Sequence, residues 1–412
     1  MPFSSLGLRA GLVEAIRDLE YQTPTPIQAQ AIPLAMAGRD LVGCAQTGTG
    51  KTAAFILPML HRLSTRKGIA ALVVTPTREL ARQIEDVARS CARYTKHRIT
   101  AVYGGVGYQQ QVDALRRGVD LLVATPGRLL DLHARGNVDL RRVEVLVLDE
   151  ADRMLDMGFW PDVKRIIGLL PEERQNLLFS ATLSGAVMRV AQPILRDPAR
   201  VDVAPSATPV ETVTQAVYPV NGFQKTDLLI RLLEEHNLER VLVFTRTKHR
   251  ADRLCRHLAN SGIRGAAIHS NRSQTQRQAA LDGFKRGHYR VLVATDIVAR
   301  GIDVDGISHV VNYDLPANPD DYIHRIGRTA RAGAEGTALS FLAAEETKEL
   351  RDIEVLLGTP LECKDLDGFN YLERILPNPE RTATRKPRTV YRGRSARSRG
   401  SRKVYRGAGW GS

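Results

Sequence analysis

The sequence predicts an α/β fold, in which two parallel-sheet domains in tandem are followed by a basic C-terminal tail. Short runs of Val, Leu and Ile recur along the chain. They are continuous rather than alternating, as in strands that are buried on both faces of a sheet. In the first half they lie at residues 40–44, 70–75, 99–103, 120–125, 145–149 and 176–180. Helix-like stretches separate these runs, and this repetition predicts a parallel sheet.

The pattern stops near residues 204–209 and then starts again. This short segment has two prolines among small polar residues, which is typical of a linker between domains. Apolar runs return at residues 240–245, 290–295, 308–314 and 336–342. We therefore predict a first domain at residues 1–204, a linker at 205–209 and a second domain of the same kind at 210–365.

Residues 366–412 form an extension that becomes strongly basic. From residue 381 onward there are nine arginines, two lysines and no acidic residue. The whole chain has a net charge of +14, so residues 1–380 carry only +3. Arg, Ser and Gly cannot bury a core, so we expect a disordered tail. Its arginines and interleaved aromatics suit a polyanion such as RNA, while a merely solubilising role is the alternative.

Cysteine usage and hydropathy exclude several classes of protein. Cys44, Cys91, Cys255 and Cys363 form no CxxC pair, so zinc-ligand spacing is absent and a reducing compartment is expected. No apolar run approaches the ~20 residues that span a bilayer. The N-terminus has no basic stretch followed by an apolar one, so we expect neither an export signal nor a membrane partner. The expected location is the cytoplasm.

A phosphate-binding loop is predicted at residues 45–52, Ala-Gln-Thr-Gly-Thr-Gly-Lys-Thr. The segment follows the predicted strand at 40–44 and precedes a helical stretch, as a P-loop requires. Its glycines let backbone amides face a phosphate, and the helix N-terminus favours negative charge. We expect Lys51 to reach the β- and γ-phosphates and Thr52 to bind Mg²⁺. A glycine-rich turn with an exposed lysine is the alternative, which the flanking strand and helix disfavour.

Two acids end the apolar run at residues 145–149. Asp149 and Glu150 are costly to bury at the end of such a strand unless a cation lies beside them. Mg²⁺ is the natural partner of Asp149, and Glu150 is then placed to orient or deprotonate an attacking water. A solvated acidic turn is the alternative, which the P-loop earlier in the chain makes less favourable.

Residues 149–152, Asp-Glu-Ala-Asp, resemble the signature of the DEAD-box RNA helicases, and the resemblance extends from about residue 3 to 361. It implies two RecA-like domains, ATP and Mg²⁺ as ligands, and RNA as substrate. Residues 23–28 resemble the adenine-reading Q motif, in which Gln28 binds the adenine edge and Tyr21 packs against the base. Phe3 matches an upstream aromatic, and Glu20 stands where the family usually has Gly. The nucleotide-binding residues implied in the P-loop are Gln46, Thr47, Gly48, Thr49, Gly50, Lys51 and Thr52.

Six further motifs resemble the family's track for the RNA backbone. They lie at residues 76–81, 104–105, 125–128, 244–247, 274–277 and 294–303. The RNA contacts that they imply are Arg78, Gly105, Thr125, Arg128, Arg246, Gln274, Arg277 and Thr295. Such contacts go mainly to phosphates and sugars, so little base specificity is implied. Contacts to the 2′-hydroxyl select RNA over DNA.

Two motifs are implied to couple the ligands. Ser180 and Thr182, in Ser-Ala-Thr, resemble the residues that bond toward Asp152 and link hydrolysis to unwinding.

In the second half, Asp303 is implied to contact the ATP ribose. Arg328 and Arg331 are three residues apart, so on a helix they would share a face. By resemblance they are arginine fingers, which complete a catalytic set with Lys51 and Glu150. Ala330 replaces the commoner Gly between them.

These motifs predict an ATP-dependent RNA helicase that unwinds short RNA duplexes or remodels RNA–protein complexes. The residues within these motifs are most similar to those of the bacterial RhlE-type subgroup. A monomeric core is expected, and family roles in ribosome assembly, RNA decay and cold adaptation are compatible with it. Two alternatives stay open, a DNA helicase or translocase and an ATP-gated RNA clamp that does not unwind. Because the site is split between the halves, ATP and RNA should favour the same closed state.

Overall fold

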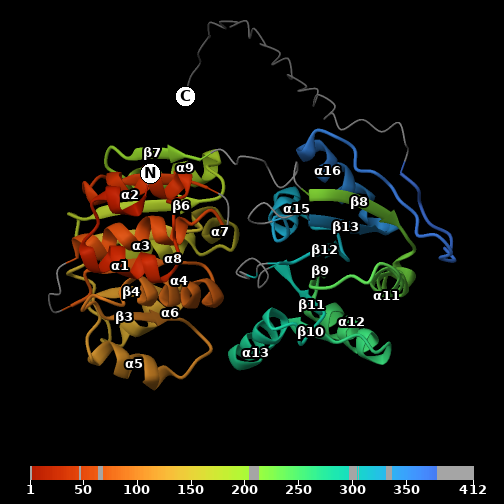
Figure 1. Ribbon diagram of the computed structural model, residues 1–412, viewed down its shortest axis with the longest axis horizontal. Coiled ribbons are helices and arrows are strands. Elements are labelled where there is room, and N and C mark those ends of the chain that lie inside the picture. The colour runs from red at the N-terminus through yellow and green to blue at the C-terminus, as the bar shows by residue number, and fades with distance from the viewer. Residues whose placement is uncertain are drawn as a thin grey trace, which may run out of the picture.

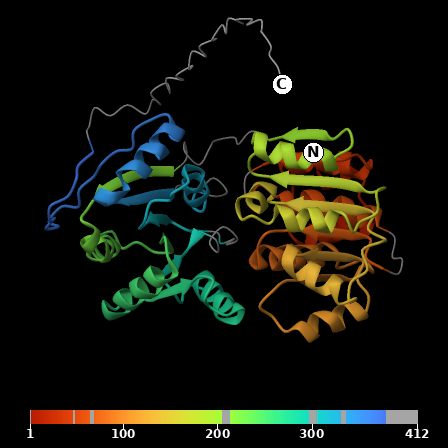
Figure 2. The same cartoon turned by 180° about the vertical axis from the view of Figure 1, so that it is seen from behind.

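The computed structural model describes residues 2–45, 48–63, 68–203, 213–296, 304, 306–330 and 336–377. These residues form two parallel β-sheets that lie side by side, each with helices on its faces (Figure 1; seen from behind in Figure 2). The predicted α/β fold class is confirmed. The predicted linker at 205–209 and the basic tail lie outside the described residues. Within the described ranges, every helix is too short or too polar to cross a membrane.

The first sheet has seven parallel strands in the order β3-β4-β2-β5-β6-β1-β7. The strands are β1 (Leu41–Cys44), β2 (Ala71–Val74), β3 (Ile99–Val102), β4 (Leu121–Ala124), β5 (Val145–Asp149), β6 (Gln175–Ser180) and β7 (Ala199–Asp202). The helices are η1 (Phe3–Leu6), α1 (Ala10–Asp18), α2 (Pro26–Met36), α3 (Lys51–Arg62), α4 (Arg78–Cys91), α5 (Tyr108–Arg116), α6 (Pro126–Ala134), α7 (Ala151–Asp156), α8 (Trp160–Ile167), α9 (Gly185–Ala191) and η2 (Gln192–Ile194).

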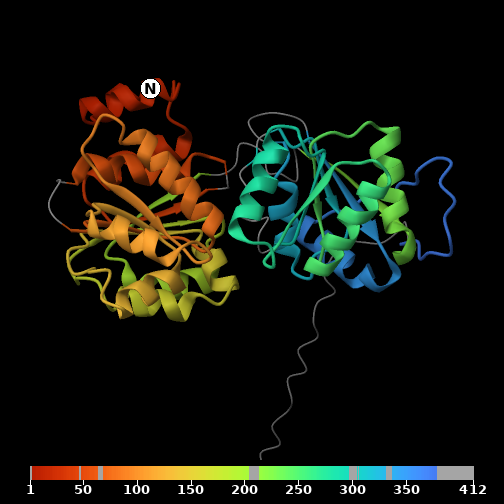
Figure 3. The ribbon, with the colours of Figure 1, turned by 90° about the horizontal axis from the view of Figure 1, so that it is seen from below.

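Two apolar clusters cover the two faces of this sheet. Along β5, Val145 and Val147 join the cluster that includes Phe55 of α3. Leu146 and Leu148 join the opposite cluster, with residues of α6 and α8. Because successive side chains of a strand point to opposite faces, both sets must be apolar. This double burial explains why the central strands are continuous apolar runs in the sequence. Figure 3 shows helices on both faces.

The second sheet has six parallel strands in the order β10-β11-β9-β12-β13-β8. The strands are β8 (Val213–Pro219), β9 (Val241–Phe244), β10 (Gly265–Ile268), β11 (Val291–Ala294), β12 (His309–Asn312) and β13 (Gly336–Leu342). The helices are η3 (Gly222–Gln224), α11 (Lys225–Glu235), α12 (Lys248–Asn260), α13 (Gln274–Lys285), α15 (Pro319–Ile326), η5 (Ala344–Glu346) and α16 (Thr347–Leu357).

The extension after α16 packs back onto the second sheet. A single parallel bridge joins Cys363 to Val217 of the edge strand β8. Leu366 is buried, and Phe369 and Tyr371 pack against the same apolar cluster. The predicted extension at residues 366–412 therefore begins as a strap on the second domain. The limits predicted for the two domains remain predictions.

Candidate nucleotide and RNA site

The order of strands sorts the predicted motifs along one edge of the first sheet. Because the strands are parallel, their C-terminal ends share this edge, where open α/β sheets bind ligands. The neighbours β3, β4 and β2 lead into the motifs at residues 104–105, 125–128 and 76–81, which were predicted to contact RNA. The neighbours β5, β6 and β1 lead into residues 149–152, residues 180–182 and the P-loop. The residues predicted to contact RNA and those predicted to bind the nucleotide therefore meet between β2 and β5, which are neighbours in the sheet.

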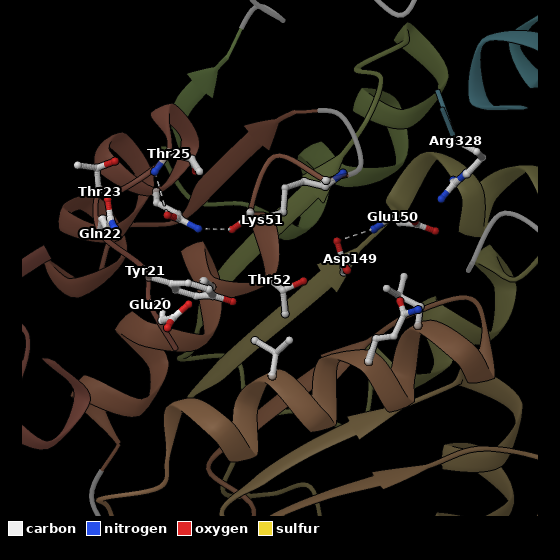
Figure 4. A pocket seen from close by; sticks show the side chains of 17 residues that line it. Glu20, Tyr21, Gln22, Thr23, Thr25, Lys51, Thr52, Asp149, Glu150 and Arg328 are labelled. Atoms are coloured by element: carbon white, nitrogen blue, oxygen red, sulfur yellow. Dashed lines mark hydrogen bonds between the residues drawn. The ribbon is translucent and has the colours of Figure 1, made fainter. Parts of the chain in front are cut away.

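The P-loop leads into α3 and forms part of a cavity of about 530 Å³ (Figure 4). Gly50 has a φ of +89°, and a Cβ there would lie 2.3 Å from Nε2 of Gln28. Only glycine therefore fits this turn. Lys51 is buried, and its Nζ donates a hydrogen bond to the backbone oxygen of Ala45 at 2.7 Å. The predicted Gln46 and Thr47 lie outside the described residues, whereas Gly48, Gly50, Lys51 and Thr52 line the cavity.

The Q motif builds one end of the cavity. The Gln28 side chain is 4% exposed. Its Oε1 accepts a hydrogen bond from the backbone N–H of Thr25 at 2.9 Å, and its Nε2 donates to the backbone oxygen of Gly50 at 3.1 Å. Gln28 therefore ties the Q motif to the P-loop. Tyr21 lines the same cavity and is 38% exposed, so its ring is available to a base.

Asp149 and Glu150 form the acidic wall of the cavity. Asp149 is buried, and its carboxylate accepts a hydrogen bond from the backbone N–H of Glu150 at 3.0 Å. Burial raises the pKa of Asp149 to about 7, which the nearby Lys51 opposes and Glu150 reinforces. Glu150 has a φ of +53°, an unfavourable backbone conformation for this residue type. Its carboxylate pairs with the buried Arg153, a partner that no motif had suggested.

Asp149 and Thr52 suit a hexacoordinate hard cation. Both residues line the phosphate end of the cavity, and a carboxylate with a hydroxyl is an all-oxygen donor set. Mg²⁺ is commonly held by one or two protein ligands, with phosphate oxygens and waters completing its shell. Among the described residues, no group of three or more His, Cys, Asp or Glu could form a dedicated metal cage. The residues present therefore fit Mg²⁺ bound together with a nucleotide.

Asp152 joins the turn after β5 to the turn after β6. Its Oδ2 accepts hydrogen bonds from the backbone N–H groups of Ala181 and Thr182, at 3.2 and 2.9 Å. The Thr182 hydroxyl donates to the same oxygen at 3.1 Å. In return, the backbone N–H of Asp152 donates to the hydroxyl of Ser180. Movement of either turn is therefore transmitted to the other.

The second domain contributes Arg328 to the cavity. This side chain lines the cavity together with Asp149 and Glu150, and Figure 4 shows it pointing toward Glu150. Arg325, one turn earlier, is buried, pairs with the partly exposed Asp296 at 2.6 Å and holds α15 against the sheet. The predicted Arg331 and Asp303 lie outside the described residues. The described part of the site is thus already split between the two domains.

A buried ion pair joins the two domains on the RNA side. Glu79 of α4 pairs with Arg277 of α13 at 2.6 Å and accepts a hydrogen bond from Gln274 at 3.0 Å. All three side chains are buried. Burial lowers the pKa of Arg277, which Glu79 opposes. Gln274 and Arg277 were predicted to contact RNA. In this structure they hold the domains together, and an RNA contact remains a prediction for them.

The other predicted RNA residues surround this junction. Arg78 lies against the glycine pair, since a Cβ at Gly105 would lie 2.0 Å from its Nη1. Thr125 is the N-cap of α6, and Arg128 lies in the first turn of that helix. Across the boundary, Thr295 follows β11, and Arg246 follows β9 with a side chain that is 46% exposed. Each residue follows the C-terminal end of a parallel strand within a few positions.

Comparisons with known proteins agree with this site. Residues 25–190 match the DEAD/DEAH box helicase family, and residues 224–333 match the helicase conserved C-terminal domain. The chain is 41% identical over 368 residues to the DEAD-box ATP-dependent RNA helicase RhpA of Helicobacter pylori, covering 89% of this chain and 75% of RhpA. It is 46% identical over 373 residues to the ATP-dependent RNA helicase RhlB of Pseudomonas aeruginosa, covering 88% of this chain and 94% of RhlB.

A solved structure has the same two-domain arrangement. S. cerevisiae Dbp5 bound to RNA and ADP BeF3 superposes with a TM-score of 0.79 at 32% identity, covering 88% of this chain and 95% of that one. The fold and the split site define a two-domain nucleotide-dependent helicase. The chain belongs to the DEAD-box family of ATP-dependent RNA helicases. The predicted RhlE-type subgroup remains a prediction.

Proposed function

We propose that this chain couples ATP binding and hydrolysis to local unwinding of short RNA duplexes or remodelling of RNA–protein complexes. The observation that carries the proposal is the split site. The P-loop and Glu150 belong to the first domain, and Arg328 reaches the same cavity from the second. On the RNA side, the Glu79–Arg277 pair crosses the same boundary. Each ligand is therefore held by both domains when they close, so each favours binding of the other.

The residues of the cavity have distinct roles in hydrolysis. Gln28 and Tyr21 hold the adenine, and residues 46–52 hold the phosphates, with Lys51 on the β- and γ-phosphates. Asp149 and Thr52 would hold Mg²⁺, which when bound would supply positive charge beside the phosphates. Glu150 orients the attacking water and accepts its proton. Arg328 and Arg331 stabilise charge on the transferred phosphoryl group, and Asp303 contacts the ribose.

Hydrolysis is linked to RNA through the turns after β5 and β6. Asp152 bonds to Ser180 and Thr182. The strand before Asp152, β5, is the neighbour of β2, which leads into Arg78. The RNA contacts are Arg78, Gly105, Thr125, Arg128, Arg246, Gln274, Arg277 and Thr295. They hold the sugar–phosphate backbone with little base specificity. Closure bends the bound strand, and an A-form duplex cannot keep its pairing across the bend.

The cellular setting follows the family. We propose a monomeric core in the cytoplasm, with partners in ribosome assembly or RNA decay. The basic tail supplies additional, sequence-independent attraction for RNA.

ATP hydrolysis in the presence of RNA and of a DNA of the same sequence tests this function. We expect single-stranded RNA to stimulate hydrolysis at least ~10-fold more than the matched DNA, because the backbone track includes 2′-hydroxyl contacts. Equal stimulation by both would indicate a DNA translocase instead. ATP binding without stimulated turnover would indicate an RNA clamp.

A further inference from the structure

An arginine–tyrosine cluster lies on the first domain next to the predicted RNA track. Tyr108 is the first residue of α5. The guanidinium carbons of Arg128 and Arg135, both from the α6 segment, lie 5.6 and 5.0 Å from the centre of its ring. The side-chain amide of Asn137 donates a hydrogen bond to the Tyr108 hydroxyl at 3.0 Å. The ring is therefore held in place before any ligand binds.

The cluster retains positive charge and an open side. Asp131 is the one acid bonded to both guanidiniums, at 2.8 Å from Arg135 and 3.9 Å from Arg128. Two arginines against one carboxylate leave a charge of +1. The Arg135 side chain is 63% exposed, and Tyr108 is partly exposed. A planar ligand can therefore reach this platform from solvent.

The position of Tyr108 relates the cluster to RNA. Tyr108 follows Gly105 by three residues, and Arg128 lies beside its ring. Gly105 lies in the loop after β3 and Arg128 in the first turn of α6, and both are proposed to hold the RNA backbone. An RNA strand that contacts both residues would therefore pass close to this ring.

We infer that Tyr108 and Arg135 form a subsite that stacks one unpaired nucleobase of the bound RNA, while Arg128 contacts a neighbouring phosphate. The inference rests on the proposed RNA function and adds a base contact to a track otherwise made for the backbone. Aromatic rings and guanidinium planes stack on any base, so the subsite is tolerant of sequence. The subsite strengthens binding of single-stranded RNA, because a paired base is stacked between its neighbours in the duplex and its face is covered.

The test measures binding of a fluorescent single-stranded RNA to the full chain and to variants. We expect Tyr108→Ala to weaken binding by about 10-fold, the scale of removing one base stack, whereas Tyr108→Phe keeps the ring and binds within twofold of the parent. Tyr94→Ala is the matched control. Tyr94 is exposed, has the Arg93 guanidinium 5.6 Å from its ring, and has its hydroxyl bonded to Asp18. It follows the end of α4 that is opposite Arg78, so its removal should have no effect.

An RNA with one abasic site at each position in turn separates stacking from loss of fold. Removing the stacked base should weaken binding by the parent chain by about the same factor, and Tyr108→Ala should be indifferent to that position. The slope of log affinity against log salt should be unchanged in Tyr108→Ala and flatter by about 0.7 in Arg128→Ala, because Arg128 contacts a phosphate. Normal affinity of Tyr108→Ala, or an equal loss for every abasic RNA, overturns the inference. If the parent chain binds no RNA, the proposed function fails instead.

Discussion

At the scale of single residues, Asp149 determines how the site responds to pH. Its burial raises the pKa to about 7, so in the ligand-free protein this carboxyl gains its charge only near neutrality. The folded state holds the proton more tightly than the unfolded chain does. The contribution of Asp149 to stability therefore falls as pH rises from about 4 to 7 and is constant above that range. The charge that destabilises the empty site is the one that attracts a cation.

Binding of an Mg²⁺-bound, non-hydrolysable ATP analogue should therefore depend on pH through Asp149. Protons compete with the cation for Asp149, so affinity for the analogue should rise by up to about 10-fold per pH unit at the acid end of the range. Above pH 7 the affinity should level off. Calorimetry at pH 5.5 to 8.5 measures this. Asp149→Asn is the control, because the titration of the nucleotide itself remains in that variant. A pH profile shared by both proteins would assign the effect to the nucleotide.

Two departures from the family pattern acquire a physical meaning at this scale. Glu20 and Ala330 stand where glycine is usual, and they have φ values of +57° and +54°. Side chains with a Cβ are strained in this left-handed region. The motifs had indicated only that the usual residue was missing. The backbone conformation shows why glycine is common at both positions.

Ala330→Gly should accordingly stabilise the protein by up to about 1 kcal/mol, since relief of strain outweighs the greater freedom of glycine in the unfolded chain. The free energy of unfolding, measured with urea, gives the answer. The matched control is Ala251→Gly, because Ala251 is a buried residue inside α12 and should lose stability. A loss of stability at both positions would mean that the Ala330 conformation carries no strain.

At the scale of elements, the sequence predicts the central strands well and misses three of the four edge strands, whereas the edge strand β3 coincides with the predicted run at residues 99–103. The runs at residues 145–149 and 336–342 coincide with β5 and β13. In contrast, β7, β8 and β10 were not predicted. β7 and β8 are edge strands, and β7 alternates buried and exposed residues. β10 is also at an edge and contains Gly-Ala-Ala-Ile. Strands that are half covered do not need a continuous apolar run, so the signal is lost.

The contact between α4 and α13 had no local signal at all. Glu79 and Gln274 are 195 residues apart, and nothing near either residue points to the other. Arg153 and Arg325 were missed for a related reason, since their ionic partners depend on the tertiary fold. The nucleotide residues were accessible from sequence because a loop and its following helix build them from consecutive positions.

Reversing the charge at this junction should weaken coupling between the domains. Glu79→Lys faces Arg277 with a like charge, so the closed state loses stability and RNA-stimulated hydrolysis at limiting RNA should fall by about 5- to 100-fold. Small-angle scattering should show a larger radius of gyration. Glu85→Lys is the control on the same helix, because Glu85 pairs with Arg89 within the first domain. The idea fails if both variants behave alike.

At the scale of the whole molecule, charge and catalysis are separated along the chain. Eleven positive charges lie after residue 380, whereas the described nucleotide residues lie between Tyr21 and Arg328. A chain ending at Glu380 should fold and hydrolyse ATP normally at saturating RNA. Its affinity for RNA at low salt should be weaker, and its slope of log affinity against log salt should be flatter by about 0.7 for each phosphate that the tail neutralises in the full chain. Equal slopes for the two chains would exclude direct RNA binding by the tail.

In the proposed mechanism, ATP closes a split site and thereby separates RNA strands. The most direct measurement is displacement of a labelled strand from a short RNA duplex, with and without ATP, by the parent chain and by Glu150→Gln. We predict ATP-dependent displacement by the parent chain. Glu150→Gln should keep ATP and RNA binding but lose steady-state hydrolysis by ~100-fold or more, and with it repeated displacement. Displacement that needs no ATP, or ATP hydrolysis stimulated by RNA with no displacement at any duplex length, would contradict the account.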